Sequence, residues 1–404
     1  MGWIILSIGM AIGAGIVFLP VQVGIVGLWS FLVSAAVAYP ALYLFQRLFI
    51  NTVAESKVCS DYPGVISGYL GKNWGVALGI LYFCMLVIWI CVYLTAITND
   101  SASYLQTFGV TKNLLSKNPL YSLILISGLV WIASGGEKFV FKISTFMVLA
   151  KLGIVAFLGI VMIRLWNPDN IGALDSSGVL IKQSIITLPF TLTSILFIQT
   201  LSPMVIFYRM REKYPQVARY KALRAMNVAF LILFVTVFFY AISFTLALGH
   251  HEAELAFQHN ISAVAIAAKF FPPSLAIVLG IALNIFAVVT AFFGVYLGFH
   301  EACRGLTLNI FHRFCPAGEL NQAWLNRSIQ WFVVVLGWGV VTLNIPILYF
   351  TSISSPIFGL VGCLIPAWLV LRVPSLAHYR NVTLIIIILT GLLLIISPFL
   401  AFGS

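Results

Sequence analysis

The stretch GMAIGAGIVFLP, from Gly9 to Pro20, lies inside an apolar run that is long enough to form a membrane helix. It nevertheless contains three glycines and ends in proline, the two residue types that weaken a helix most. A helix in lipid must satisfy its own backbone hydrogen bonds, because no water is present to replace them. These breakers therefore predict a local interruption that faces protein or a ligand. The alternative is close helix packing, since Gly9-x-x-x-Gly13 fits the small-residue pattern of membrane helix pairs.

The composition indicates the solvent in which this chain folds. The 404 residues are 61% hydrophobic and only 8% charged, against about 25% charged in an ordinary soluble domain. Apolar runs of about 20 residues recur along the whole length, and each is long enough to cross a bilayer. The sequence therefore predicts one polytopic membrane domain over residues 1–404. The net charge of +11 is typical of positively charged cytoplasmic loops, so we expect a bilayer and no nucleic acid as its partner.

Eleven membrane spans are predicted, near residues 3–25, 27–48, 73–99, 120–135, 143–165, 183–208, 225–248, 273–300, 327–346, 348–371 and 382–402. Of the 22 Lys and Arg residues, sixteen fall in the loops on one side and five in those on the other, with Lys151 inside a span. Basic residues accumulate in cytoplasmic loops. We therefore expect a cytoplasmic N-terminus and a C-terminus on the opposite side of the membrane.

A second interrupted span is predicted at LPFTLTSILFIQTLSPMVIFY, from Leu188 to Tyr208, which contains Pro189 and Pro203 and is rich in Ser and Thr. The two interrupted spans come first in two halves of five spans each. Broken helices at matching positions of two halves point to the binding site of a secondary transporter.

An amino acid can satisfy the backbone groups that a broken helix leaves open. Its carboxylate accepts N–H bonds at the N-terminus of a half-helix, where the helix dipole is positive. Its ammonium group binds the carbonyls that the break releases. Glycine allows backbone and ligand to approach without a Cβ atom between them.

Lys151 lies about eight residues into the fifth span, or roughly 12 Å deep at 1.5 Å per residue. One interpretation is that its side chain extends back to the membrane surface. The other is that it faces the bundle, where burial disfavours the ammonium and lets the residue gain and lose a proton during transport. Its ammonium could also take the place of a coupling sodium ion. We therefore predict proton coupling, with sodium coupling as the alternative.

Several motifs resemble the bacterial hydroxy and aromatic amino acid permeases, the group that includes tyrosine, tryptophan and serine permeases. The resemblance covers nearly the whole chain. It rests on AIGAGIVFLP (11–20), YLTAITN (93–99), AKLGIVAFLGIVM (150–162), LPFTLTS (188–194), TAFFGVYLG (290–298) and SISSPIFGLVGCLIP (352–366). The stretch SILFIQTLSP (194–203) differs from many members, which carry Gly or Asn with His there, and this difference leaves the substrate side-chain contacts open.

The resemblance implies an all-α, five-plus-five inverted-repeat fold of the LeuT type with broken helices 1 and 6. The two repeats would cover residues 1–165 and 183–371, and an additional helix would cover 382–402. Carried over position by position, the resemblance implies unwound stretches at Gly13–Gly15 and Ser194–Phe197. It implies a substrate site at Gly13, Ala14, Gly15, Ile16, Tyr93, Ser194, Ile195, Leu196 and Phe197. It also implies an ion or proton site at Lys151 and Thr290.

The predicted function is import of a neutral amino acid by proton symport, and the resemblance implies a bacterial inner membrane with a periplasmic C-terminus. Tyrosine or tryptophan is favoured because the motifs around Lys151 and Thr290 resemble the tyrosine and tryptophan branch of the family. A serine or threonine permease is the alternative, and a non-transporting amino acid sensor is the alternative from another class. We expect no enzyme, since no acidic residue falls at mid-span. We also expect no cofactor and no metal site, because the six cysteines form no C-x-x-C pair. The oligomeric state is not readable from the sequence.

Overall fold

The computed structural model describes residues 2–57, 59, 62–107, 110–113, 115–135, 137–174, 176–258, 273–315, 320–343 and 354–402. Within these ranges the chain is helical and contains no strand. The main helices are α1 (Gly2–Ala11), α2 (Ala14–Val26), α3 (Leu28–Ala54), α4 (Tyr62–Leu70), α5 (Lys72–Thr107), α6 (Pro119–Ser134), α7 (Glu137–Val161), α8 (Ser177–Thr193), α9 (Ile198–Arg211), α10 (Pro215–Ala247), α11 (His250–Gln258), α13 (Pro273–Phe314), α14 (Gln322–Thr342), α16 (Ile365–Arg372) and α17 (Thr383–Phe402).

Eight of the described segments are long and apolar enough to cross a bilayer. They are Leu28–Ala54, Asn73–Asn99, Ser144–Leu165, Ser177–Arg211, Pro215–Ala247, Ile285–His312, Ser354–Arg372 and Thr383–Leu400. The other three predicted spans fall on shorter or less apolar helices: the first on α1 and α2, the fourth on α6, and the ninth on α14. The structure therefore shows an all-helical membrane protein, and the number of eleven spans stays a prediction.

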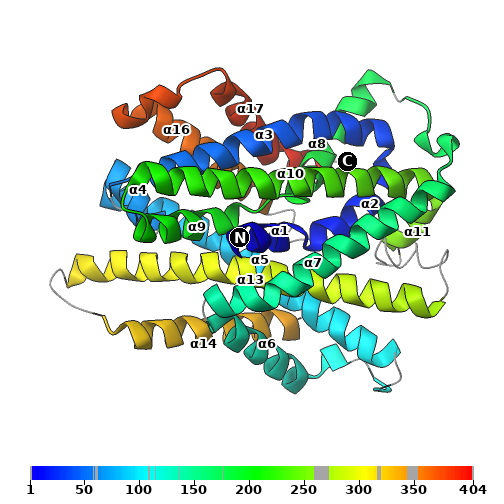
Figure 1. Ribbon diagram of the computed structural model, residues 1–404, viewed down its shortest axis with the longest axis horizontal. Helices are drawn as coiled ribbons and strands as arrows, with labels where there is room; N and C mark the ends of the chain where they lie inside the picture. Colours follow the sequence, from blue (N-terminus) through cyan, green and yellow to red (C-terminus); the bar gives the residue numbers. More distant parts are fainter. Residues whose placement is uncertain are drawn as a thin grey trace.

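The long helices run roughly side by side, and the short α1 and α2 lie among them (Figure 1). Helix α1 packs against α7, α10 and α13, and α13 packs along α5. Most of α1 is buried, including every residue from Leu6 to Ala11. A helix that is apolar and buried all round belongs to the interior of a bundle, so the N-terminal segment forms part of the core.

The outer helices expose large apolar side chains. Trp131 of α6, Phe146 of α7 and Trp331 of α14 are 75%, 69% and 68% exposed. An apolar surface of this extent is unfavourable in water and is expected where lipid is the solvent.

The chain leaves regular helix at two places, one in each of the two spans for which the sequence predicts an interruption. Helix α1 ends at Ala11 and α2 begins at Ala14, and α8 ends at Thr193 while α9 begins at Ile198. The prolines do not mark these ends, because Pro20, Pro189 and Pro203 all lie inside helices.

Candidate functional site

The side chain of Lys151 connects three helices at the first helix end. Lys151 lies on α7 and is fully buried. Its Nζ donates hydrogen bonds to the backbone oxygen of Gly9 at 2.6 Å, to that of Ile12 at 2.7 Å and to Oγ1 of Thr290 on α13 at 2.5 Å. An ammonium group has three donors and no acceptor, so these three oxygens use its whole hydrogen-bonding capacity. The side chain does not extend to the membrane surface.

The position of these carbonyls explains why a cation fits here. The last carbonyls of a helix have no partner within the helix, and the C-terminal end of the helix dipole is negative. Gly9 and Ile12 stand at that end of α1, where the amide of Gly13 turns back to the oxygen of Ala11 at 2.8 Å. The Lys151 ammonium therefore donates to carbonyl oxygens at the C-terminal end of α1, where the helix provides no further backbone N–H donors.

Gly9 allows α1 to come this close to α7 and α13. A Cβ atom at Gly9 would lie 2.7 Å from Cγ2 of Val148 and 3.3 Å from Cβ of Thr290. The packing interpretation of Gly9 thus agrees with its surroundings, and its carbonyl in addition accepts from Lys151.

Gly13 lies between α1 and α2, directly against Tyr93 of α5. A Cβ atom at Gly13 would lie 3.0 Å from the Tyr93 hydroxyl oxygen and 3.0 Å from Cβ of Ala291. Ala14, Gly15 and Ile16 form the first turn of α2, so the interval between the helices is shorter than the predicted Gly13–Gly15 stretch. The side chains from Ala14 to Phe18 lie outside the described residues.

The second interval, Ser194 to Phe197, is buried along its whole length. Two side-chain hydroxyls donate to nearby backbone oxygens. Oγ of Ser194 donates to the oxygen of Thr191 at 2.6 Å, and Oγ1 of Thr200 donates to the oxygen of Phe197 at 2.8 Å. Among the described residues, the backbone N–H groups of Ile195 and Phe197 donate to no acceptor. Buried amides without partners are rare in proteins, so this interval has donors available for a bound group.

A hydroxyl contact links the two broken segments. Oγ of Ser7 on α1 lies 3.1 Å from Oγ1 of Thr200 on α9. Glycines of α13 bring both helices close, because a Cβ at Gly294 would lie 2.6 Å from Cβ of Met10, and one at Gly298 would lie 2.4 Å from the backbone oxygen of Gln199. The sequence analysis did not single out Ser7, whose signal was only a hydroxyl within an apolar helix.

Polar contacts hold the helices together at the end of the bundle where basic residues gather. The Glu301 carboxylate of α13 accepts from Oγ of Ser202 on α9 at 2.9 Å and from the backbone amide of Tyr62 at the start of α4. Arg219 of α10 donates to Glu55 at 2.6 Å and to the hydroxyl of Tyr379 at 2.6 Å. These contacts join α13 to α9 and α4, and α10 to Glu55 and Tyr379.

The predicted residues fall into two groups. Lys151 and Thr290 meet at the end of α1, beside Gly13 and Tyr93, whereas no hydrogen bond in the described part of the chain joins Ser194–Phe197 to them. Two cavities among the described residues lie elsewhere, one between α3 and α10 and one beside the end of α2. No group of three or more His, Cys, Asp or Glu with a metal-binding arrangement occurs in the described ranges.

No family model matches the chain. Curated relatives do match it over its whole length. It is 65% identical over 405 residues to the "Probable serine transporter" of Escherichia coli K12, covering 100% of this chain and 91% of that protein. It is 27% identical to the "Serine transporter SdaC" of the same organism, covering 100% and 94% of the two chains. It is 25% identical to the "Inner membrane transport protein YqeG", covering 97% and 95%.

Among solved structures, the chain is similar to MhsT, which was crystallised in complex with L-phenylalanine. The TM-score is 0.58 at 17% identity, and the match covers 100% of this chain and 97% of that one. MhsT has the LeuT fold, so this likeness shows that fold for the chain. The relatives are transporters, and the chain is a transporter rather than an enzyme. It belongs to the family of bacterial amino acid permeases that contains the serine transporters of Escherichia coli.

Proposed function

We propose that this protein imports L-serine across a bacterial inner membrane as a secondary active transporter. The observation that carries the proposal is the 65% identity to a probable serine transporter along the entire chain. The comparisons favour the serine alternative over the aromatic amino acids that the sequence analysis placed first. The motifs that favoured an aromatic substrate surround Lys151 and Thr290. These two residues contact each other and the backbone of α1, and not a pocket for a substrate side chain.

The proposed binding site lies between the two interruptions, at Gly13–Ile16 and Ser194–Phe197. Amides of Ile195 and Phe197 without acceptors, together with the positive N-terminal ends of α2 and α9, suit the substrate carboxylate. The hydroxyls of Tyr93 and Ser194 are the proposed partners of the serine side chain. Tyr93, Leu196 and Phe197 are at most 3% exposed, and a centre filled by such large groups favours a small substrate side chain.

The proposed coupling ion is a proton carried by Lys151. Protonated, Lys151 has three donors for the carbonyls of Gly9 and Ile12 and for Thr290. Deprotonated, it loses one donor and its charge, so these contacts to the end of α1 weaken and α1 is released. Sodium coupling is the alternative, with the ion in the place that the ammonium occupies. A sensor that does not transport is the alternative from another class.

The proposed architecture has eleven spans in two inverted repeats, 1–165 and 183–371, followed by 382–402. The breaks in helices 1 and 6 are placed at residues 12–13 and 194–197. The N-terminus is proposed to be cytoplasmic, because sixteen basic residues then lie on the cytoplasmic side. The contacts of Glu301 and Arg219 then lie on that side and must break before serine is released there.

Counterflow in liposomes tests the substrate. Vesicles that contain the purified protein are loaded with unlabelled L-serine and diluted into labelled L-serine, and each of the twenty amino acids is added in turn as a competitor. We expect labelled serine to accumulate transiently and serine, then threonine, to compete. Competition by tyrosine or tryptophan without competition by serine would restore the aromatic prediction. No exchange for any of the twenty would support the sensor.

A further inference from the structure

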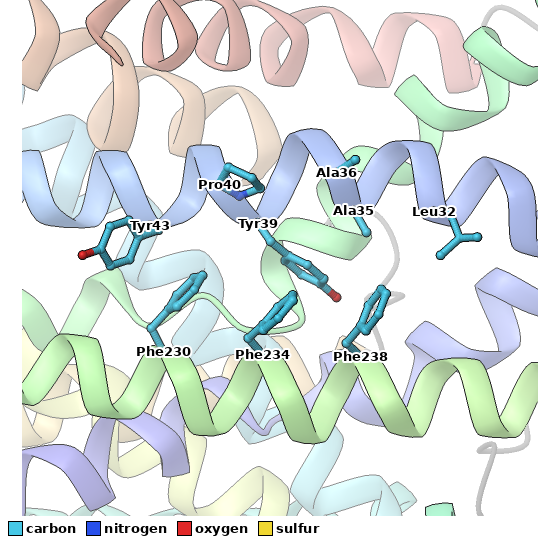
Figure 2. Close-up of a pocket in the computed structure, with 9 residues that line it drawn as sticks. All are labelled: Leu32, Ala35, Ala36, Tyr39, Pro40, Tyr43, Phe230, Phe234 and Phe238. Carbon is cyan, nitrogen blue, oxygen red and sulfur yellow. The ribbon is translucent and has the colours of Figure 1, made fainter. Parts of the chain in front are cut away.

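A lipid-facing groove of 420 Å³ lies between α3 and α10, outside the proposed substrate site. Figure 2 shows Phe230, Phe234 and Phe238 in a row along α10, opposite Tyr39 and Tyr43 of α3. Nearly all of the groove surface is apolar. Both helices belong to candidate membrane spans, so this groove is open to the acyl chains of the bilayer.

Aromatic contacts fix the groove walls. The ring centroids of Tyr43 and Phe230 lie 5.3 Å apart, and those of Tyr39 and Phe234 lie 5.4 Å apart. These pairs place α3 and α10 antiparallel with a constant register: a step of four residues toward the C-terminus of α3 matches a step of four toward the N-terminus of α10. Aromatic pairs of this kind are favourable beyond their area, so the groove is a built feature of the helix pair.

The length of the groove matches one leaflet. It extends along α3 from Leu32 to Tyr43, which is about 16 Å at 1.5 Å per residue. Half of the hydrocarbon core is about 15 Å thick. A helix with side chains is about 10 Å wide and exceeds this volume, whereas a single extended acyl chain fits it.

Two arginines stand at one end of the groove. Arg47 lies one turn beyond Tyr43 on α3, and Arg224 lies six residues before Phe230 on α10, so the helix register places both at the same end. Both side chains are exposed. Neither forms an ion pair or a hydrogen bond with another described residue. The acidic residues at this end, Glu55 and Glu212, are paired with Arg219 and Lys221.

We propose that this groove binds one anionic phospholipid. The acyl chain lies along the row of aromatic pairs that joins α3 and α10, and the headgroup phosphate lies between Arg47 and Arg224. Guanidinium groups match phosphate geometry with paired hydrogen bonds, and basic pockets between membrane helices are typical binding sites for anionic headgroups. With the proposed topology the lipid belongs to the cytoplasmic leaflet. The binding site does not depend on the identity of the transported amino acid.

Native mass spectrometry of the full-length protein tests this proposal. Delipidated protein in detergent is mixed with equal amounts of phosphatidylglycerol and phosphatidylcholine of identical chains. We expect the wild type to retain phosphatidylglycerol about tenfold better. The double variant Arg47→Gln/Arg224→Gln should lose this preference. The variant Arg372→Gln, which removes another exposed arginine near the same side, should keep it.

A second variant tests the acyl chain. Ala36 lines the groove and is exposed, so Ala36→Trp should fill the groove and lower the retention of both lipids. Val37→Trp, at the neighbouring exposed position that does not line the groove, is the matched control. Size-exclusion profiles and melting temperatures establish that each variant is folded.

Three results would overturn the proposal. The first is equal retention of the two lipids by the wild type, and the second is an unchanged preference in the double arginine variant. The third is displacement of phosphatidylglycerol by soluble glycerol 3-phosphate at equal concentration, which would show a phosphate site without an acyl groove. Loss of serine exchange with lipid selectivity intact would contradict the transport proposal alone.

Discussion

The ammonium group of Lys151 lies 2.7 Å from the backbone oxygen of Ile12, the residue that follows the last turn of α1. The two residues are 139 positions apart in the chain. A lysine in the middle of a membrane span is costly unless its charge is compensated, and a helix end in the same interior leaves carbonyls without donors. Each feature therefore compensates for the other, and a change at either one should affect transport.

Replacing Lys151 with methionine should abolish the accumulation of serine against a gradient. Methionine has a similar length but no donor, so the oxygens of Gly9 and Ile12 lose their partner and no group remains to carry the proton. Uptake into liposomes driven by an inward proton gradient measures this. Lys142→Met, at an exposed position of the same helix, is the control and should leave uptake unchanged. Wild-type accumulation by Lys151→Met would exclude the coupling role.

Replacing Gly13 with alanine should weaken serine binding by about tenfold, which is about 1.4 kcal/mol. The added Cβ would lie 3.0 Å from the hydroxyl oxygen of Tyr93, so the ring must move within the proposed site. In a Tyr93→Phe background the same substitution should cost less, because the hydroxyl contact is absent and only the contacts to Cε1 of the ring at 3.1 Å and to Cβ of Ala291 at 3.0 Å remain. Serine-dependent thermal shifts of the four proteins give the coupling between the two sites. An equal cost in both backgrounds would show that the two residues act independently.

Replacing Gly298 with alanine should lower the melting temperature and the yield of folded protein. Its Cβ would lie 2.4 Å from the backbone oxygen of Gln199, so α9 must separate from α13. Gly153→Ala, where an added Cβ meets nothing within 4 Å, is the control and should be neutral or slightly stabilising. Equal melting temperatures of the two variants would contradict the close approach of α9 and α13.

Stability should fall above pH 10 partly through Tyr379, which lies outside the spans. Burial, followed by the hydrogen bond to Glu55 and its charge, raises the pKa of Tyr379 above its ordinary value. The folded state thus keeps a proton that the unfolded chain loses above about pH 10, so the stabilisation is present below that pH and is lost as the pH rises beyond it.

Thermal unfolding between pH 8 and 11 measures this effect. Tyr379→Phe should show a shallower alkaline loss than the wild type. Tyr220→Phe, at a side chain that is 65% exposed, is the matched control and should follow the wild-type curve. Parallel curves for all three proteins would show that the contact between Tyr379 and Glu55 does not contribute to the alkaline loss of stability.

The membrane class and the approximate helices could be predicted from the sequence, because run length and composition are local properties. The position of the lysine was also evident, since Lys151 is the one basic residue that lies far from both ends of a predicted span. The direction of its side chain was not evident from the sequence. Whether a lysine extends to the surface or faces the bundle depends on the packing of α1 against α7, which brings together residues far apart in the chain.

Proline is a poor guide to where these helices end. Proline was an obvious signal, yet Pro189 and Pro203 lie inside α8 and α9. A proline removes only one donor, and neighbouring groups in a bundle can compensate for it. The interval at residues 12–13 instead lies where Gly9 and Lys151 make tertiary contacts between helices far apart in the chain.

The aromatic substrate was ranked first on motifs that do not report the size of a side-chain pocket. The residues that favoured an aromatic substrate surround Lys151 and Thr290, which make contacts to the backbone of α1. Under the proposed function, such contacts serve ion coupling and not recognition of the substrate side chain. Side-chain selectivity resides in pocket volume, where one methylene changes binding by only about 1–3 kcal/mol, and no short motif reports that volume.

The most direct test of the central claim is serine-driven proton flux. Liposomes that contain the purified protein and an internal pH indicator are placed in sodium-free buffer, and L-serine is added outside. We predict that the interior acidifies with the wild type and does not with Lys151→Met. Serine entry that requires sodium and leaves the internal pH unchanged would contradict the assignment of Lys151 as the proton carrier.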